Sequence, residues 1–338
     1  MTERLEKLCS LYGTSGREDA VLEYILSELP ADAEATVDAL GNLIVFKKGK
    51  HRANHRVMLC AHMDEVGMLI THITDDGYLK FDTVGGISVP ALFGKAVRVG
   101  EKLVPGVIGV KPVHLLEGDE EKKYPKKESL YIDIGAASKA DAETVVSIGD
   151  CAYFDSCVVS FGDGYVKGRA LDDRAGCAIL LEMLHTELEY DLWFAFTVQE
   201  ETGLGGAGPA AYRIDPEFAL VLETTTASDI DGVEGENKVC RLGKGAVVSQ
   251  MDRRTVYLPK MYEKAFAVAK EHGIPAQPKT VVAGGNDAGV IFKTRAGVAV
   301  QALSLPCRYL HSPSCVIMEK DYDATRDLAS CLAAELAQ

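Results

Sequence analysis

Four apolar runs of strand length, alternating with segments of helical periodicity, constrain the fold of this chain most strongly. The runs are VMLCA (57–61), LWFAFTV (192–198), FALVLE (218–223) and VAVQALSL (298–305). Helices are predicted between and after them over 173–187, 259–273 and 320–336. Strands that alternate with helices are typical of α/β proteins, so we expect the chain to contain an α/β domain.

The first 50 residues are predicted to add a helical segment and a hairpin. Residues 2–30 have helical character, and Ser15 followed by Glu18 has the spacing of a capping box. The next stretch, ATVDALGNLIVFKKG, has the pattern of a hairpin that turns at Gly41 and Asn42.

The segment 66–162 differs from the rest of the chain. Short β-like runs alternate there with Gly, Asp and Pro, and helical periodicity is scarce. These features predict a small β-barrel or sandwich, and the charged stretch 117–128 is expected to be a solvated loop. We therefore expect residues 1–65 and 163–338 to form one domain that residues 66–162 interrupt as an insert.

Composition excludes several classes of function. The net charge is −14 and the basic residues form no stripe, which argues against a nucleic-acid partner. No apolar run approaches the length of a membrane span, and the N-terminus lacks the apolar core of a signal peptide. The nine cysteines are scattered and include no CxxC pair, so reduced thiols in a cytoplasmic protein are expected.

Polar residues gather where the predicted strands end. His62 and Asp64 follow the first run, Glu200 and Glu201 follow the second, and Glu223 closes the third. His311 lies shortly after the fourth run, and Asp172 and Asp173 stand at a helix entrance. In open α/β sheets the ligand crevice lies outside the carboxyl ends of the strands, so these residues are expected to converge.

This set of side chains fits divalent metal ions. Imidazole and carboxylate ligands suit zinc, cobalt and manganese alike. Two metals in one site need a bridging carboxylate with further His and Asp or Glu ligands on each side. The ligand set that we expect is His62, Asp172, Glu201, Glu223 and His311.

The two adjacent glutamates are expected to have different roles. Neighbouring side chains on an extended or tightly turning backbone diverge, so Glu200 and Glu201 are not expected to bind one ion together. One can bind a metal while the other takes a proton from a metal-bound water molecule. Asp64 is placed to accept the second ring N–H of His62 and so to fix its tautomer.

The motifs that carry these residues resemble one known family. They are AHMDEVG (61–67), GRALDDRAGC (168–177), VQEETGLGGA (198–207), LETT (222–225) and RYLHSP (308–313), with LYIDIGA (130–136) in the insert. The chain resembles the tetrahedral (TET) aminopeptidases, also called glutamyl or deblocking aminopeptidases and "cellulase M", within the clan of dinuclear zinc peptidases. The resemblance covers nearly the whole chain, and the ordered motifs together are specific.

The resemblance implies a fold and a role for each matching residue. It implies a mixed-sheet, three-layer zinc-peptidase domain, a β-rich oligomerisation insert, and assembly into dodecamers that act on peptides. His62 and Glu223 would hold one metal, Glu201 and His311 the other, and Asp172 would bridge them. Glu200 would be the general base and Asp64 the residue that orients His62.

The resemblance has departures and leaves choices open. Asp is frequent in the family where this chain has Glu223, and Thr is more usual at Asn286. Asp173 rivals Asp172 as the bridge, but the clan pattern favours Asp172. Asp287 is expected to cap a helix. Whether its loop also lines the substrate pocket is left open by the sequence.

The expected function is that of a metal-dependent aminopeptidase acting through a metal-bridged water. One rival is a glycosidase, which needs carboxylates on opposite sides of a sugar, whereas Glu200 and Glu201 are adjacent. Another is an amidohydrolase or deacylase of the same clan, and a third is an assembly protein without activity. The preferred N-terminal residue, the native metal, and the choice between dimer and dodecamer stay open at this stage.

Overall fold

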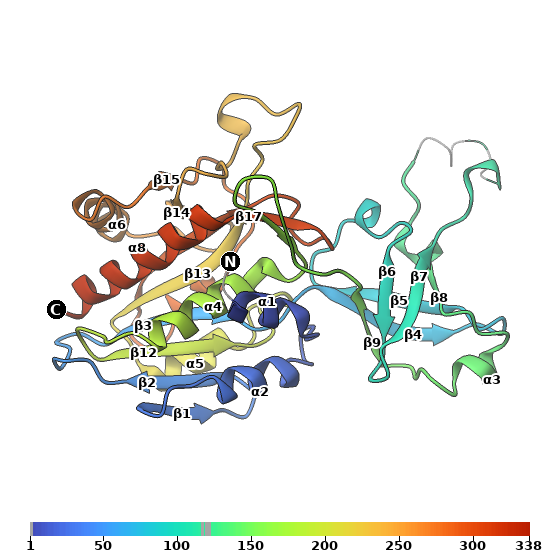
Figure 1. The fold of residues 1–338 in the computed structure, drawn as a ribbon, viewed down its shortest axis with the longest axis horizontal. Coiled ribbons are helices and arrows are strands. Elements are labelled where there is room, and N and C mark those ends of the chain that lie inside the picture. The colour runs from blue at the N-terminus through green and yellow to red at the C-terminus, as the bar shows by residue number, and fades with distance from the viewer. Residues whose placement is uncertain (1–2, 116–117, 119–122) are drawn as a thin grey trace.

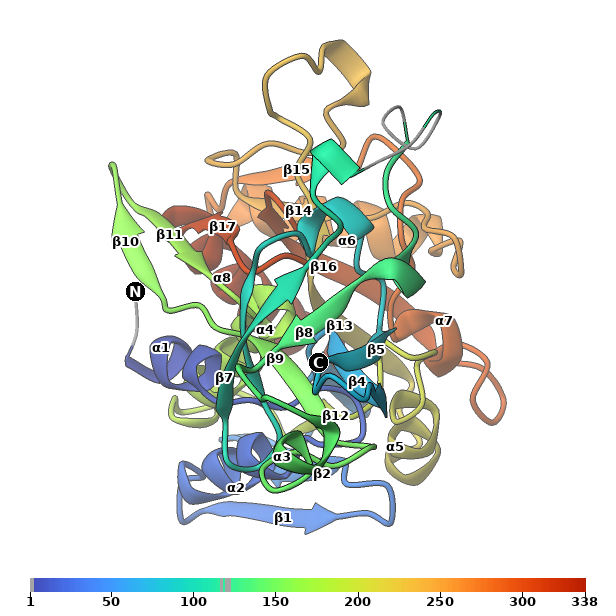
Figure 2. The ribbon, with the colours of Figure 1, turned by 90° about the vertical axis from the view of Figure 1, so that its right-hand side faces the viewer.

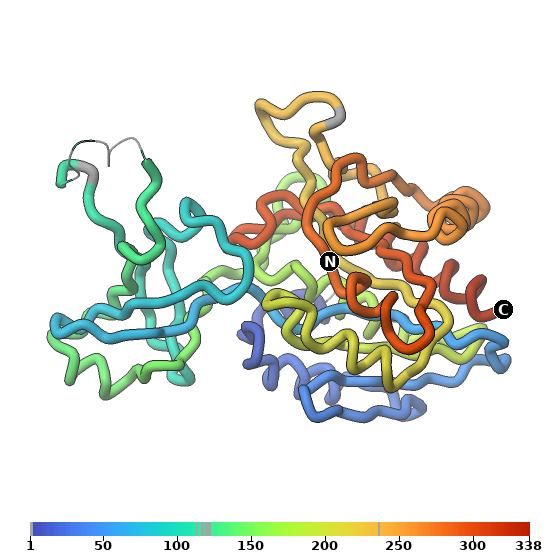
Figure 3. The backbone as a smooth tube through the Cα atoms, turned by 180° about the vertical axis from the view of Figure 1, so that it is seen from behind, coloured from blue at the N-terminus to red at the C-terminus, as the bar shows by residue number. Residues whose placement is uncertain are grey.

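The computed structural model describes residues 3–115, Gly118 and 123–338. A large α/β body carries a smaller β-barrel that projects from one end (Figure 1). The C-terminus lies on the body, at the end far from the barrel (Figure 3). Part of the 117–128 stretch, which was expected to be a solvated loop, lies outside the described residues.

The body is built on an eight-stranded mixed sheet. Its strand order is β1-β2-β12-β3-β13-β16-β14-β15, and the four strands from β12 to β16 run parallel. The strands are β1 (Ala33–Val37), β2 (Leu43–Lys47), β3 (Val57–His62), β12 (Leu192–Thr197), β13 (Phe218–Thr226), β14 (Ala246–Val248), β15 (Ala276–Pro278) and β16 (Ala299–Cys307). The predicted hairpin at Gly41 and Asn42 is confirmed as the antiparallel β1–β2 pair.

Helices cover both faces of this sheet. They are α1 (Glu3–Ser10), α2 (Asp19–Ser27), α4 (Leu171–Leu184), α5 (Ala207–Ile214), α6 (Pro259–Glu271), α7 (Ala288–Ile291) and α8 (Glu319–Ala337). The uniformly apolar sequence of β3 follows from this arrangement, because Leu59 and Ala61 face one core and Met58 and Cys60 face the other.

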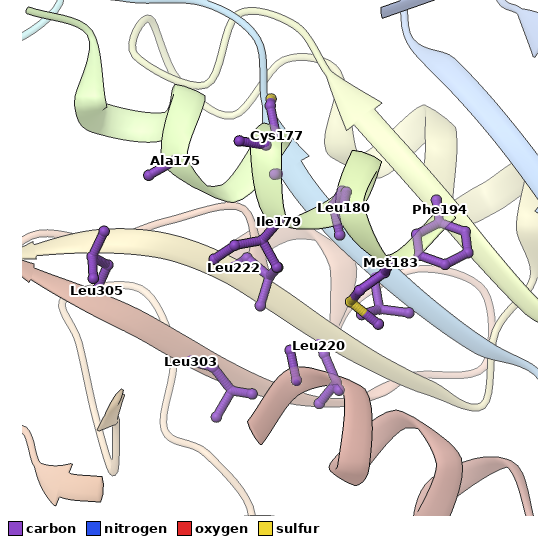
Figure 4. Close-up of a cluster of buried hydrophobic side chains, with 14 of the residues drawn as sticks. Ala175, Cys177, Ile179, Leu180, Met183, Phe194, Leu220, Leu222, Leu303 and Leu305 are labelled. Carbon is purple, nitrogen blue, oxygen red and sulfur yellow. The ribbon is translucent and has the colours of Figure 1, made fainter. Parts of the chain in front are cut away.

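The larger core lies between the sheet and the face formed by α1, α2, α4, α6 and α8. Figure 4 shows Ile179 and Met183 of α4 among Leu220 and Leu222 of β13 and Phe194 of β12. Alanine and isoleucine side chains of α5 and α7 pack against the opposite face. The predicted three-layer α/β architecture is therefore confirmed.

Six further strands close into a barrel (Figure 2). They are β4 (Gly67–Ile73), β5 (Leu79–Val84), β6 (Ala96–Val99), β7 (Val104–Gly109), β8 (Tyr131–Asp133) and β9 (Cys151–Phe154), with the short helix α3 (Lys139–Ala142) between β8 and β9. The barrel has its own hydrophobic core, which includes Met68, Phe81 and Ile132. Of the two expected alternatives, a barrel or a sandwich, the closed barrel is present.

A three-stranded sheet follows the barrel. It is formed by β10 (Val159–Phe161), β11 (Tyr165–Gly168) and β17 (Cys315–Met318), all antiparallel. β10 lies within the segment 66–162 but pairs with β11 outside the barrel. The chain thus returns from the barrel through β10 to β11, the strand that precedes α4.

The N-terminal segment differs from its prediction as a helical stretch over 2–30. The structure contains α1 and α2, separated by the non-helical residues 11–18. Glu18 is the residue before α2, and neither its side chain nor that of Ser15 caps the helix. The capping box is therefore wrong, because both side chains bond to other segments.

The nine cysteines are free. Cys157 is exposed and Cys331 is half-buried, and the other seven are buried. Among the residues that the structure describes, no helix combines the length and apolarity needed to cross a membrane.

A buried ionic cluster joins three segments where the barrel meets the body. The carboxylate of Glu65 accepts two hydrogen bonds from Arg169 and one from the Gly13 amide. Arg174 lies 3.6 Å from the same carboxylate and donates to the carbonyl of Met63. The charged side chains are almost fully buried. The cluster therefore fixes the segment that leads into the barrel at Glu65 and the segment that leads into α4 at Arg169.

The Glu65→Gln substitution tests this cluster. It removes the only negative charge of the cluster and leaves two buried guanidinium groups uncompensated, which is expected to lower the free energy of unfolding by about 3–5 kcal/mol. Urea unfolding followed by circular dichroism measures the change. Glu34→Gln, in an exposed pair with Lys48, is the control, and an equal effect of the two substitutions would contradict the assignment.

Candidate metal centre

The predicted site residues converge at the carboxyl ends of the parallel strands. They surround a cavity of about 300 Å³ whose lining includes Asp172, Glu200, Glu201, Glu223 and His311. His62 ends β3 and lies behind this lining, with only 2% of its surface exposed. This is the position at which open α/β sheets bind ligands.

Asp172 stands between the two histidines. Its Oδ1 lies 3.5 Å from His62 Nε2, and its Oδ2 lies 3.2 Å from His311 Nε2. On the first side, Glu223 Oε1 lies 3.4 Å from His62 Nε2. On the second side, Glu201 Oε1 lies 3.3 Å from His311 Nε2. The five side chains thus form two sets that share Asp172.

The spacing within each set fits a metal ion. Ligand atoms held at about 2.0 Å from zinc in tetrahedral geometry lie about 3.3 Å from one another. Asp172 Oδ1 and Glu201 Oε1 are buried and have no hydrogen-bond partner among the described residues. Oxygen atoms in this state are costly to bury unless a cation meets them. The donor set and its unsatisfied oxygens therefore fit divalent cations.

Charge balance within the cluster leads to the same conclusion. Burial raises the pKa of Glu223 and of Glu200 well above the usual value, and it raises that of Glu201 to about 7. Burial opposes protonation of His311, but Asp172 and Glu201 outweigh it and raise its pKa to about 10. The cluster needs positive charge, which protons or metal ions can supply.

Backbone carbonyls fix the tautomers of both histidines. His62 Nδ1 lies 3.0 Å from the carbonyl oxygen of Asp64, and His311 Nδ1 lies 2.8 Å from that of Gly86. A carbonyl only accepts, so each Nδ1 carries hydrogen and each Nε2 faces the carboxylates. Gly86 follows β5, so the barrel contributes directly to the site.

Asp64 has more partners than the sequence predicted. Its Oδ1 lies 3.4 Å from His62 Nδ1, whereas its backbone carbonyl oxygen lies closer to that nitrogen, at 3.0 Å. Its carboxylate also accepts from the backbone N–H groups of Glu200 and Glu201, at 3.0 and 3.1 Å. Asp64 therefore anchors the turn that carries both glutamates as well as contacting His62.

Glu200 and Glu201 diverge, as expected for neighbours on a turn. Glu201 faces His311, whereas Glu200 lines the cavity and makes no ion pair with either histidine. The turn begins at Gln199, whose φ of 56° lies in the left-handed region. It packs closely against Asn42, because a Cβ atom on Gly206 would lie 2.1 Å from Asn42 Oδ1. Only glycine fits at that close approach.

Asp173 is distinguished from Asp172 by what it faces. A group of side chains with metal-ligand spacing can be drawn with either residue. Asp173 is fully buried, does not line the cavity, and accepts from the Gly176 N–H at 3.0 Å, as a helix-capping carboxylate does. Asp172, by contrast, lines the cavity and faces both histidines.

Several cavity residues were missed from the sequence. Lys279 and Arg254 line the cavity, and no motif or spacing pointed to either. Asn286 and the glycines before it also line it, which answers the open question about that loop. Asp287 precedes α7 but makes no capping hydrogen bond, because its carboxylate accepts from the Thr197 hydroxyl at 2.7 Å.

Comparison with known proteins relates this chain to aminopeptidases. Residues 41–328 match the family described as M42 glutamyl aminopeptidase. A lysyl aminopeptidase of Pyrococcus furiosus is 33% identical over 99% of this chain and 97% of its own length.

Solved structures agree in fold. A TET aminopeptidase from a marine sediment Thaumarchaeota archaeon has a TM-score of 0.92 and 34% identity, covering 99% of this chain and 96% of that one. The TET1 peptidase of Pyrococcus horikoshii has a TM-score of 0.86 and 38% identity, with 99% of each chain covered. That peptidase can assemble into a tetrahedron or a large octahedral shell.

Proposed function

Because the chain belongs to the M42 glutamyl aminopeptidase family and is a metallo-aminopeptidase, we propose that two divalent cations bind in its cavity. His62 and Glu223 would hold one, Glu201 and His311 the other, and Asp172 both. The observation that carries this proposal is that each carboxylate oxygen of Asp172 faces a different histidine. Zinc suits the ligands best, and cobalt and manganese also fit.

The chain's own residues supply the proton transfers. Bound there, the cations would polarise the scissile carbonyl, stabilise the oxyanion and lower the pKa of a water molecule. Glu200 lines the same cavity, and its carboxylate makes no ion pair with His62 or His311. It takes the proton of the attacking water and delivers it to the amine that leaves. A glycosidase is not favoured, because Glu200 and Glu201 are adjacent and cannot flank a sugar.

Glu200→Gln is expected to lower kcat by about 10²- to 10⁴-fold, because glutamine cannot accept the proton. The metal content of the variant should match that of the wild type. Rates on a peptide substrate and metal content by mass spectrometry are the two measurements. Asp172→Ala is the contrasting variant and should lose both metal and activity. A Glu200→Gln enzyme with normal turnover would exclude the base assignment.

Charges in the cavity favour an acidic N-terminal residue in the substrate. The four carboxylates that line the cavity balance the charge of two divalent cations. Lys279 and Arg254 are the remaining charged residues of the lining. Lys279 is half-buried, and its Nζ donates to the Ala283 carbonyl at 2.7 Å. Thr224 Oγ1, in the same wall, has no hydrogen-bond partner among the described residues. A carboxylate of the substrate can satisfy these groups.

Lys279→Met tests this preference. The ratio of kcat/KM for a glutamyl anilide to that for a leucyl anilide should fall about 10- to 100-fold, the effect of one lost hydrogen bond to a charged group. Lys293→Met, at an exposed lysine outside the cavity lining, is the control. A wild-type enzyme that prefers leucyl or lysyl anilides, or an unchanged ratio in the variant, would contradict the proposal.

The barrel is proposed to mediate assembly, and residues 66–162 to act as an inserted oligomerisation domain. Its surface exposes the apolar residues Leu69, Val107, Val145 and Ile148, and an interface on the barrel would remove them from water. The TET1 peptidase of Pyrococcus horikoshii can assemble into a tetrahedron or a large octahedral shell, and we propose a dodecamer for this chain. The free cysteines support a reducing, cytoplasmic location.

Native mass spectrometry tests the assembly. The wild type should have the mass of twelve chains, and Ile148→Asp with Val107→Asp should give smaller species, because charges in an apolar interface are costly. Leu40→Asp, at an exposed apolar residue of the body, is the control. A wild-type monomer would contradict the proposal.

A further inference from the structure

Two side chains of the N-terminal segment reach the active-site turn. Ser15 and Glu18 have the spacing of a capping box, yet neither side chain caps α2. The Ser15 hydroxyl donates to Asp64 Oδ2 at 2.6 Å. Glu18 Oε1 accepts from the Gln199 N–H at 3.0 Å and from the Gly16 N–H at 2.9 Å. The segment between α1 and α2 is thus bonded to the residues that follow β3 and to the turn that follows β12.

The bond from Ser15 bears on the orientation of the two glutamates. Asp64 Oδ2 accepts from the Ser15 hydroxyl and from the Glu201 N–H, while its Oδ1 accepts from the Glu200 N–H. The two backbone bonds require one orientation of the carboxylate. The hydroxyl of Ser15 is a further donor to Oδ2, beside the His62 ring at 3.4 Å from Oδ1, and it helps to hold this orientation.

The bond from Glu18 acts on Gln199, the residue before the two glutamates. Gln199 has a φ of 56°, a left-handed conformation that costs a non-glycine residue free energy unless its surroundings impose it. The Glu18 carboxylate, 7% exposed, accepts the Gln199 N–H and so helps to impose it. Ser15 and Glu18 therefore act on three consecutive residues, Gln199 to Glu201.

We propose that Ser15 and Glu18 are positioning residues for the reaction, because they hold the turn that presents Glu200 to the substrate and Glu201 to its metal ion. The inference rests on the proposed roles of those glutamates. Neither side chain lines the cavity, so neither touches the substrate. Their loss is expected to change kcat and to leave KM nearly unchanged.

Ser15→Ala is the primary test, on the full-length, zinc-loaded protein. We expect kcat to fall about tenfold, which corresponds to the loss of one hydrogen bond to a charged group, with KM within twofold. Ser15→Thr keeps the hydroxyl and should restore wild-type kcat. Ser10→Ala is the matched control, because that exposed hydroxyl bonds only to the Lys7 carbonyl among the described residues.

Deuterium uptake gives a readout that does not depend on activity. In the metal-free protein, peptides covering 198–204 should take up deuterium faster in Ser15→Ala and in Glu18→Ala than in the wild type or Ser10→Ala. Glu18→Gln keeps an acceptor oxygen and should behave as the wild type. If Ser15→Ala fails to fold, Ser15→Cys, a weaker donor, should give an intermediate kcat.

The outcomes separate this inference from the proposed function. A wild-type protein without peptidase activity would refute the proposed function. An active wild type that Glu200→Gln inactivates, combined with normal kcat and uptake in Ser15→Ala, would refute the positioning role alone. A change confined to KM, or an equal effect of Ser10→Ala, would also refute it.

Discussion

The carboxylate of Asp172, which faces His62 with one oxygen and His311 with the other, is the interaction on which the rest of the site depends. Glu223 and Glu201 complete the two sides, and all of these groups are largely buried. So many carboxylates cannot remain ionised together in a buried site without compensating positive charge. The fold nevertheless brings these carboxylates together, and bound cations would provide the compensating charge in the active enzyme.

Holding such a cluster requires support from outside it. The Gly86 carbonyl reaches His311 from the barrel, and the Asp64 carboxylate holds the Glu200–Glu201 turn. The Glu65 cluster fixes the segments on which Asp64 and Asp172 lie. Much of the buried polar structure at this end of the sheet therefore positions the proposed ligands, in keeping with the role of outer partners at metal sites.

The parts that the sequence predicted well follow from local pattern. Apolar runs marked the central strands, and each predicted ligand followed or closed one of them or stood at a helix entrance, so the rule for strand ends brought distant residues together. Ser15 and Glu18 were misread, because their bonds to Asp64 and Gln199 join residues far apart in the chain. Lys279 was missed, because no motif or spacing marks it as a cavity residue. The Ser15–Glu18 spacing even favoured a local capping box, which tertiary contacts replaced.

The central claim is that Asp172 is shared by two metal ions. Its most direct test is a crystal structure of the zinc-loaded protein with an anomalous difference map measured at the zinc edge. We expect two peaks, both within about 2.0–2.2 Å of Asp172 oxygens, one beside His62 and Glu223 and the other beside His311 and Glu201. A single peak, or a peak bound to Asp173 in place of Asp172, would contradict the account.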